Sequence, residues 1–256
     1  MDAYTQFPSV YDIFMDQAPY REWASFLTRT LNRFGVEKGD LVLDLGCGTG
    51  TLTELLSRRG FDMIGVDASA AMLSVAMDKR KTDGQILYLL QDMREFELYG
   101  TVAAAVSVCD SLNYLLEEED MIQTFRLVNN YLDPEGIFVF DFNTVYKYET
   151  VIGDRTIAEN RDHCSFIWEN YYHKKQAVNE YDLTVFVQED GEERFRRFRE
   201  THYQRGYTLQ QMKRYLTQAG MGFIEACDAD TLEPVTEVSQ RIYCIAREAG
   251  KGNTGR

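Results

Sequence analysis

The stretch LVLDLGCGTG, residues 41–50, contains the residue types and spacing that most directly suggest chemistry. An apolar run ends in three glycines at alternate positions, and Asp44 precedes the first of them by two residues. A glycine-rich turn after a strand is typical of a site for a nucleotide-like ligand. A dinucleotide site requires G-x-G-x-x-G, but here the third glycine comes one residue early and Thr51 takes its place. Asp44 would also repel a pyrophosphate, so the stretch favours a cationic ligand without phosphates.

Two further acids follow the next two predicted strands. Asp67 ends the segment FDMIGVD, and Asp92 ends ILYLLQD. A carboxylate at the first position can accept hydrogen bonds from both hydroxyls of a ribose, and one at the second can accept from an adenine amino group. S-Adenosylmethionine carries a ribose, an adenine, a sulfonium and an ammonium, and it has no phosphate. The acids and the glycine turn therefore predict S-adenosylmethionine as the cofactor.

The segment CDSLNYL, residues 109–115, follows the fourth predicted strand, where the reactive methyl group of that cofactor should lie. Asp110 and Asn113 are polar residues at the rim of this apolar strand. They either position a substrate, with Asp110 binding an amine or acting as a base, or they cap a loop and a helix. Asp141 and Asn143, after the fifth strand, are expected to be caps.

A second candidate for acid–base chemistry is His202, in RETHYQRGY, residues 199–207. A histidine can act as a base near neutral pH, although a single histidine can equally be structural. Arg205 and Tyr207 stand just before a helix that returns to the core, which favours a position near the cleft. The predicted catalytic residues are therefore Asp110, Asn113, His202 and Arg205.

Strands and helices must alternate to position these residues. Strands are predicted at 41–46, 61–67, 86–92, 101–109 and 137–143, and helices at 51–59, 69–80 and 117–132. Such alternation indicates a parallel sheet with helices on both faces. Helices at 10–16 and 19–34 precede it, and a helix at 208–220 and strands at 223–230 and 241–248 complete it.

The alternation of strands and helices is interrupted by a β-rich insertion. Strands are predicted at 165–175, 178–190 and 194–207, with a hairpin turn at 189–193. Tyr181, Leu183, Val185 and Val187 should share one buried face. The insertion either caps the carboxyl end of the core as a lid or pairs with a second subunit. The lid is the preferred interpretation, because both ends of the insertion lie near the active-site edge.

The motifs VLDLGCGTG, GVDASAAML, LLQDMREF and CDSLNYL resemble those of class I S-adenosylmethionine-dependent methyltransferases. The resemblance covers most of residues 40–145 and implies a Rossmann-like α/β fold with a seven-stranded sheet whose last strand is antiparallel. It also implies that Gly46, Cys47 and Gly48 pass the methionine part and that Asp67 holds the ribose. Ala68 and Met72 would then flank the adenine or ribose, and Asp92 and Met93 would hold the adenine. The N-terminal YDIFMD and the insertion resemble a bacterial group of uncharacterised small-molecule methyltransferases.

The chain is expected to form one α/β core with additions. Residues 1–36 form N-terminal helices that act as a lid, 37–150 and 206–248 the core, 151–205 the insertion, and 249–256 a disordered tail. Tyr11, with Tyr20 and Trp23, either forms an aromatic cover over the cofactor or anchors the N-terminal helices on the core. Tyr11 is therefore counted with the cofactor-binding residues.

Composition limits the partners. The chain has 256 residues and a formal net charge of -14, which disfavours nucleic acid as a partner. No signal peptide or membrane-spanning run is recognisable. The five scattered cysteines indicate reduced thiols in the cytoplasm, and the three separated histidines indicate no metal site. A monomer or a homodimer is expected.

These observations predict a metal-independent methyltransferase that moves a methyl group from S-adenosylmethionine to a small molecule or small peptide by in-line displacement. One alternative is a non-catalytic regulator that binds the same cofactor. The other is a nicotinamide-dependent reductase, which Asp44, Thr51 and the lack of a Tyr-x-x-x-Lys pair at reductase spacing oppose.

Overall fold

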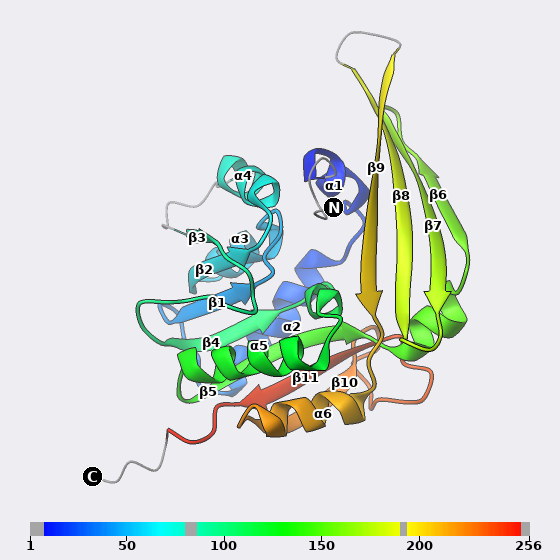
Figure 1. Ribbon diagram of the computed structural model, residues 1–256. Helices are drawn as coiled ribbons and strands as arrows, with labels where there is room; N and C mark the ends of the chain where they lie inside the picture. The colour runs from blue at the N-terminus through cyan, green and yellow to red at the C-terminus, as the bar shows by residue number, and fades with distance from the viewer. Residues whose placement is uncertain (1–7, 80–85, 190–193, 252–256) are drawn as a thin grey trace.

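The computed structural model describes residues 8–79, 86–189 and 194–251, and it contains two β-sheets (Figure 1). The main sheet has seven strands in the order β10-β11-β5-β4-β1-β2-β3, and the second has four in the order β6-β7-β8-β9. The predicted fold class, a seven-stranded α/β sheet with an antiparallel β insertion, is confirmed.

The main sheet is parallel except for its last strand. Its strands are β1 (Leu41–Leu45), β2 (Asp62–Asp67), β3 (Leu87–Leu90), β4 (Val102–Ser107), β5 (Leu132–Asn143), β10 (Gly222–Asp228) and β11 (Arg241–Arg247). β11 lies between β5 and β10 and is antiparallel to both. The carboxyl ends of the parallel strands therefore meet at one edge, where ligands of such sheets bind.

Helices cover both faces of this sheet. They are α1 (Pro8–Phe14), α2 (Tyr20–Arg33), α3 (Thr51–Ser57), α4 (Ala70–Lys79), α5 (Glu118–Tyr131) and α6 (Leu209–Gln218). Side chains of β5 alternate between the two faces: Phe138 and Phe140 pack in the cluster formed with α5 and α6, and Val139 packs in the cluster formed with α2 and α3. Two apolar cores thus sandwich the sheet, as expected for strands that are covered on both faces.

Two local features differ from the sequence prediction. The segment PEG, predicted as a turn, lies inside β5 as an irregularity, with Glu135 at φ 65 and a register shift opposite Val102 and Ala104. Three elements were not predicted at all: the 3-10 helix η1 (Ser111–Tyr114), the π-helix η2 (Lys147–Ile152) and the strand β6 (Thr156–Asn160). β6 is a largely exposed edge strand, so its sequence lacks the apolar alternation that identifies a half-buried strand.

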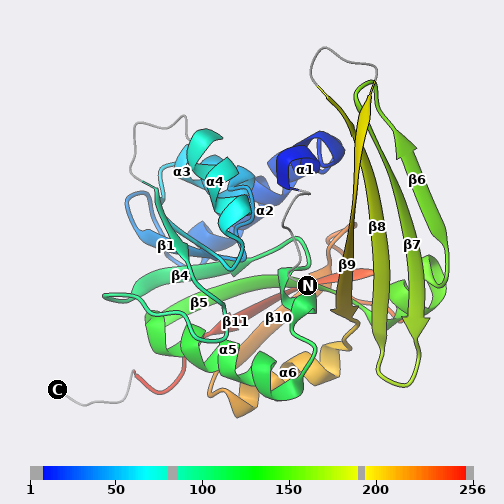
Figure 2. The same ribbon diagram turned by 45° about the horizontal axis from the view of Figure 1, so that its top comes forward.

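The second sheet stands beside the carboxyl edge of the main sheet, toward which the arrowheads of β1 and β4 point (Figure 1). Besides β6 it contains β7 (Cys164–His173), β8 (Val178–Gln188) and β9 (Phe195–Arg205), all antiparallel. Leu183 and Val185 of the predicted apolar face are buried and pack with Val10 and Phe14 of α1. Figure 2 shows α1 between α4 and this sheet. Residues 190–193 of the predicted hairpin turn lie outside the described residues.

The ends of the chain complete the description. Residues 1–7 and residues 252–256 of the predicted tail lie outside the described residues. The start of the predicted tail is held in place, since the Ala249 N–H donates to Oδ1 of Asn129 and Lys251 Nζ donates to the Asn130 carbonyl. Within the described ranges no helix is both long and apolar enough to cross a membrane.

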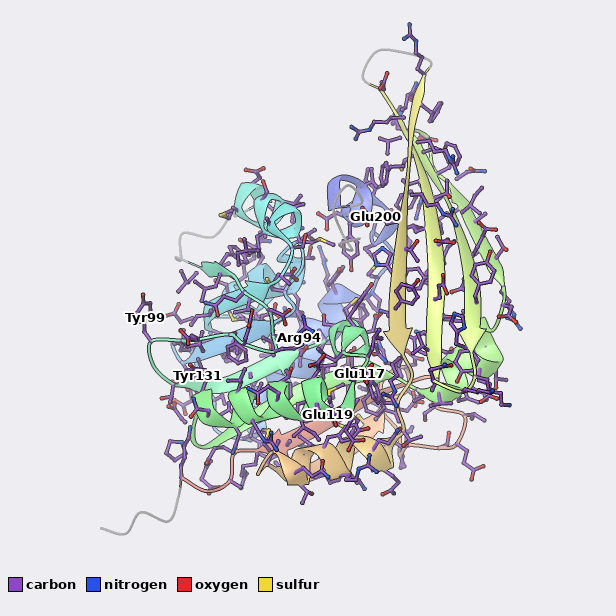
Figure 3. All side chains as sticks on the ribbon, in the orientation of Figure 1. Arg94, Tyr99, Glu117, Glu119, Tyr131 and Glu200 are labelled. Atoms are coloured by element: carbon purple, nitrogen blue, oxygen red, sulfur yellow. The ribbon has the colours of Figure 1, made fainter. Side chains whose placement is uncertain are left out.

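Phe140 is fully buried and contacts the rings of Phe125 and Phe138 at centroid distances of 5.2 and 4.8 Å. Phe140→Ala is expected to lower the free energy of unfolding by about 3–5 kcal/mol, because it removes apolar burial and leaves a cavity. Denaturant unfolding measures the change. The control Tyr99→Ala removes an exposed ring at the edge far from the second sheet (Figure 3) and should change stability little. Equal effects of the two substitutions would contradict the core assignment.

Candidate active site

The glycine turn between β1 and α3 has the conformation that its sequence requires. Gly46, Gly48 and Gly50 all have positive φ, at 80°, 54° and 73°. A Cβ on Gly46 would lie 2.6 Å from the Ser111 side chain, so the turn has no room for alanine there. The N–H groups of Gly46 and Cys47 donate to the Val66 carbonyl at 2.8 and 3.0 Å. The turn is therefore fixed against the end of β2.

Asp67, the last residue of β2, ties this turn to the start of α4. Its Oδ2 accepts from the Gly48 N–H and its Oδ1 from the Ser69 N–H, both at 2.8 Å. Ser69 in turn caps α4, since its Oγ accepts from the Met72 N–H. A carboxylate has about four acceptor positions, so Asp67 can take two further hydrogen bonds from a ligand.

Asp44 is almost completely buried beneath the turn. Its Oδ2 accepts from the Thr53 hydroxyl at 2.6 Å. Burial raises the pKa of Asp44 to about 7, the Thr53 hydrogen bond opposes this shift, and the negative charge of Asp67 adds to it. Burial also raises the pKa of the Cys47 thiol, which agrees with a structural role for that residue. A buried acid with a raised pKa gains most from a cationic neighbour.

A cavity of about 580 Å³ lies at the carboxyl edge of β1, β2 and β4. All ten predicted cofactor-binding residues line it: Tyr11, Asp44, Gly46, Cys47, Gly48, Asp67, Ala68, Met72, Asp92 and Met93. Its volume is within the usual range for small-molecule sites, roughly 300–1,000 Å³. Residues that are distant in sequence thus converge on one cavity.

Asp92, beyond β3, is paired with an arginine that the sequence analysis did not consider. Arg94 donates from Nε to Oδ1 at 2.9 Å and from Nη2 to Oδ2 at 2.6 Å, and it also bonds Asp120. These contacts lower the pKa of Asp92. Asp92 is therefore ionised at neutral pH and can still accept from a ligand amino group.

The chain turns sharply after β4. Cys109 and Asp110 have φ of 65° and 55°, which is uncommon for residues other than glycine. Their N–H groups donate to Oδ2 and Oδ1 of Asp141 at 3.0 and 2.8 Å, and Asp141 is fully buried. The predicted capping role of Asp141 accounts for these contacts. Cys109 lines the cavity, whereas Asp110 accepts a hydrogen bond from Gln204 Nε2 of β9.

The four predicted catalytic residues lie outside the lining of the cavity. Asn113 is fully buried in η1 (Ser111–Tyr114); it accepts from the Asn143 N–H and donates to the carbonyls of Asn143 and Arg205. Arg205 donates to the Leu116 carbonyl at 2.6 Å. His202 is buried on β9, with Nδ1 3.2 Å from the Tyr114 hydroxyl. Asn113 thus fastens β5 to β9, and His202 approaches the cavity through Tyr114.

Helix α1 is fastened over the glycine turn by Asp12. Its Oδ1 accepts from the Thr49 hydroxyl and its Oδ2 from Lys79 Nζ, each at 2.7 Å. Lys79 Nζ also donates to Thr51 Oγ1 at 2.9 Å. Tyr11, the preceding residue, reaches within 3.9 Å of the Cys109 sulfur. The helix therefore holds Tyr11 over the cavity.

Comparison with known proteins gives one consistent result. The methyltransferase domain family model matches residues 42–136. A protein of Geobacillus sp. (strain WCH70), named for the methyltransferase family, is 35% identical over 96% of this chain and 100% of its own length. The glycine/sarcosine N-methyltransferase of Halorhodospira halochloris is 28% identical over 67% of this chain and 58% of its own length. The crystal structure of an S-adenosylmethionine-dependent methyltransferase from Clostridium acetobutylicum ATCC 824 is 27% identical, covers 97% of this chain and 100% of that chain, and has a TM-score of 0.86.

The chain belongs to the S-adenosylmethionine-dependent methyltransferases. The predicted family and cofactor are confirmed. The comparisons lend no support to a nicotinamide-dependent reductase.

The residues present in this methyltransferase fit S-adenosylmethionine. Asp67 has acceptor capacity for ribose hydroxyls, and the buried acid Asp44 complements a cation. Three carboxylates, Asp44, Asp67 and Asp92, line the cavity, and Arg94, the one cation among its described lining residues, is already paired. This charge distribution suits a cationic cofactor without phosphates.

Sequence reasoning missed several residues of the site. Ser111, Tyr114 and Leu115 line the cavity and belong to the CDSLNYL segment, so the segment carried the signal although only its Asp and Asn were selected. The pairing of Asp12 with Lys79 left no local signal, because the two residues are 67 positions apart.

Asp67→Ala is expected to weaken binding of S-adenosylhomocysteine at least about tenfold. The substitution removes the acceptor for the ribose and releases the Gly48 N–H, and hydrogen bonds to a charged group contribute roughly 1.5–3 kcal/mol each. Titration calorimetry measures the dissociation constant. Asp62→Ala, at the exposed start of the same strand, is the matched control. An unchanged constant in folded Asp67→Ala would remove Asp67 from the site.

Cofactor affinity should increase with pH through the titration of Asp44. With a pKa of about 7, this acid is protonated at pH 6 and ionised at pH 7.5, and only the ionised form attracts the cationic cofactor. The affinity for S-adenosylmethionine should therefore rise roughly tenfold between these pH values. In Asp44→Asn the rise should be absent. The same pH dependence in both proteins would assign it to another group.

Proposed function

We propose that this methyltransferase acts on a small-molecule acceptor, a term that here includes a small peptide. The observation that supports the proposal is the limited volume of the cavity. The cofactor-binding wall continues into Cys109, Ser111, Tyr114 and Leu115, and the aromatic rings of Tyr11 and Tyr20 border the same space. An acceptor must share about 580 Å³ with the cofactor, which suits a small molecule better than a polymer.

The name of one relative supports a small-molecule acceptor. The glycine/sarcosine N-methyltransferase that matches two thirds of this chain acts, by its name, on small molecules. The net charge of -14 opposes binding to a nucleic acid backbone. We propose that the protein works in the cytoplasm as a monomer or homodimer, consistent with its five free cysteines.

The residues of the chain orient the reactants and exclude water. The bound cofactor supplies an activated methyl group on a sulfonium. The cofactor would be held by Asp44, Asp67, Asp92 and the glycine turn, and α1 and the second sheet would act as a lid. Orientation of the acceptor in line with the C–S bond that breaks would favour the transfer, and exclusion of water would prevent competing hydrolysis.

The four residues predicted to be catalytic are given roles here that follow from their contacts. Asp110 bonds Gln204, and Asn113 bonds the backbone of Arg205, so these residues position β9 and the lid. Arg205 anchors the same strand to Leu116. His202 does not line the cavity and would act on an acceptor only through the Tyr114 hydroxyl, which lies 3.2 Å from its Nδ1. Within the described residues no group of three His, Cys, Asp or Glu side chains is arranged to hold a metal ion, and we propose metal-independent transfer.

Two measurements test this function. Titration calorimetry should show binding of S-adenosylhomocysteine and much weaker binding of NADH. Release of S-adenosylhomocysteine from the labelled cofactor should depend on an added small-molecule acceptor and should survive EDTA. Binding without turnover on a broad panel of metabolites would favour a non-catalytic regulator, and loss of turnover in EDTA would overturn the metal-independent mechanism.

A further inference from the structure

A line of side chains connects the cavity to a buried carboxylate on the second sheet. Tyr114 lines the cavity, and its hydroxyl lies 3.2 Å from Nδ1 of His202. On the far side of the imidazole, Nε2 lies 3.4 Å from Oε2 of Glu200. Figure 3 shows Glu200 on the side of β9 that faces α1. Tyr114 belongs to η1 and the other two residues to β9, so the line exists only because the second sheet is docked on the core.

The imidazole in this line packs against two tyrosine rings, those of Tyr114 and Tyr181. It stacks on the ring of Tyr181 with centroids 4.9 Å apart and 7° between planes. The hydroxyls of Tyr181 and Tyr114 lie 2.7 Å apart. Among the described residues, the titratable groups shown against His202 include Glu200 on its own strand, Tyr181 on β8 and Tyr114 on η1. Both His202 and Glu200 are buried, which strengthens the attraction between the carboxylate and an imidazolium.

The Glu200 carboxylate, the His202 imidazole and the Tyr114 hydroxyl lie next to one another in space and form a path that can accept a proton. In this geometry Nε2 of His202 faces the Glu200 carboxylate, and Nδ1 is the ring nitrogen that can take a proton from the Tyr114 side. A phenol hydroxyl that donates to Nδ1 can itself accept hydrogen bonds. Tyr114 is therefore the group that touches an acceptor, and His202 and Glu200 act through it.

The charges around the cavity indicate what kind of acceptor would deliver a proton. The three carboxylates that line the cavity are assigned to the cofactor and do not select the acceptor, but no unpaired cation is found among the described lining residues either, because Arg94 is neutralised by Asp92 and Asp120. The rings of Tyr11 and Tyr20 add faces that attract cations. An acceptor bearing an ammonium group suits these surroundings better than a carboxylate or a phosphate.

We propose that Tyr114, backed by His202 and Glu200, removes a proton from an acceptor that enters as an ammonium ion, so that the acceptor is a primary or secondary amine. This inference rests on the function proposed above. The ammonium N–H passes its proton to the Tyr114 oxygen as the Tyr114 hydroxyl proton moves to Nδ1 of His202. The lone pair freed on nitrogen forms the new N–C bond while the C–S bond breaks and sulfur keeps its electron pair. After the product leaves, His202 returns its proton through the Tyr114 hydroxyl to the open cavity, since His202 itself is buried and Tyr114 lines the cavity.

The first test observes the imidazole directly. The chain has three histidines, so ¹⁵N-histidine labelling gives a simple spectrum of the protein saturated with S-adenosylhomocysteine. Tyr114→Phe should shift the Nδ1 resonance of His202 and leave those of His163 and His173 in place. Cyclohexylammonium should shift the His202 resonance in the unsubstituted protein, whereas the matched neutral probe cyclohexanol should not. An unmoved Nδ1 resonance in Tyr114→Phe, or an equal response to both probes, overturns the proposal.

The second test uses the pH profile of methyl transfer to a panel of primary and secondary amines, with the corresponding alcohols as matched compounds. Amines should be methylated and alcohols should not. Tyr114→Phe should lose at least about 100-fold of the rate at pH 7 and recover about tenfold per pH unit, because the free amine then forms in solution. Glu200→Gln should show a smaller loss with the same recovery. Tyr203→Phe, on the exposed face of β9, is the control and should behave like the unsubstituted protein.

The outcomes separate the proposals. Methylation of the alcohols in place of the amines, or a loss in Tyr114→Phe that is equal at every pH, overturns the proton path and leaves the proposed function standing. Calorimetry of each variant with S-adenosylhomocysteine shows whether it is folded. If the unsubstituted protein itself fails to bind S-adenosylhomocysteine, the proposed function fails together with the inference.

Discussion

The buried carboxylate of Asp141 fixes the turn on which both halves of the site depend. It accepts the N–H groups of Cys109 and Asp110, whose left-handed backbone costs of the order of 1–3 kcal/mol at each residue. Hydrogen bonds to a charged acceptor contribute roughly 1.5–3 kcal/mol each, so the two contacts offset the strain. The turn then directs η1 back across the edge of the sheet. Ser111 donates to the Gly46 carbonyl, and Tyr114 extends to the second sheet. One carboxylate thus places the glycine turn and the second sheet relative to each other through η1.

The acids of the cavity oppose folding and favour binding for the same physical reason. Desolvation raises the pKa of both Asp44 and Asp67, so the unliganded protein keeps these carboxylates ionised only at a cost. A cation in the cavity removes part of that cost. The Asp44 carboxylate is held by Thr53 and not by a basic side chain, which leaves its charge available to a ligand. Stability is therefore lost where cofactor affinity is gained, a balance that is common at functional sites.

Features that a local sequence pattern encodes could be predicted, whereas contacts between residues far apart in the sequence could not. The glycine turn and the acids after β2 and β3 were identified because the end of a parallel strand is a defined position relative to the ligand. Tyr114 was passed over because an aromatic residue beside an apolar strand is ordinarily core. Glu200 was passed over because strand alternation shows which residues share a face but not what that face meets. The contact of Asp12 with Lys79 and the exposed strand β6 depend on tertiary packing, which no local pattern encodes.

The inner face of the second sheet explains how the insertion is held in one register on the core. The part of this face that contains Val185 and Phe198 packs on α1 through apolar contacts, and such contacts tolerate small displacements. On β9 the same face continues as Glu200, His202 and Gln204, and buried polar groups are costly unless each has a partner. Gln204 bonds Asp110 and the Tyr148 hydroxyl, and His202 meets Tyr114. A shift of β9 by two residues would break all of these contacts at once. Apolar burial therefore attaches the sheet, while the polar row selects the single position in which β9 meets η1.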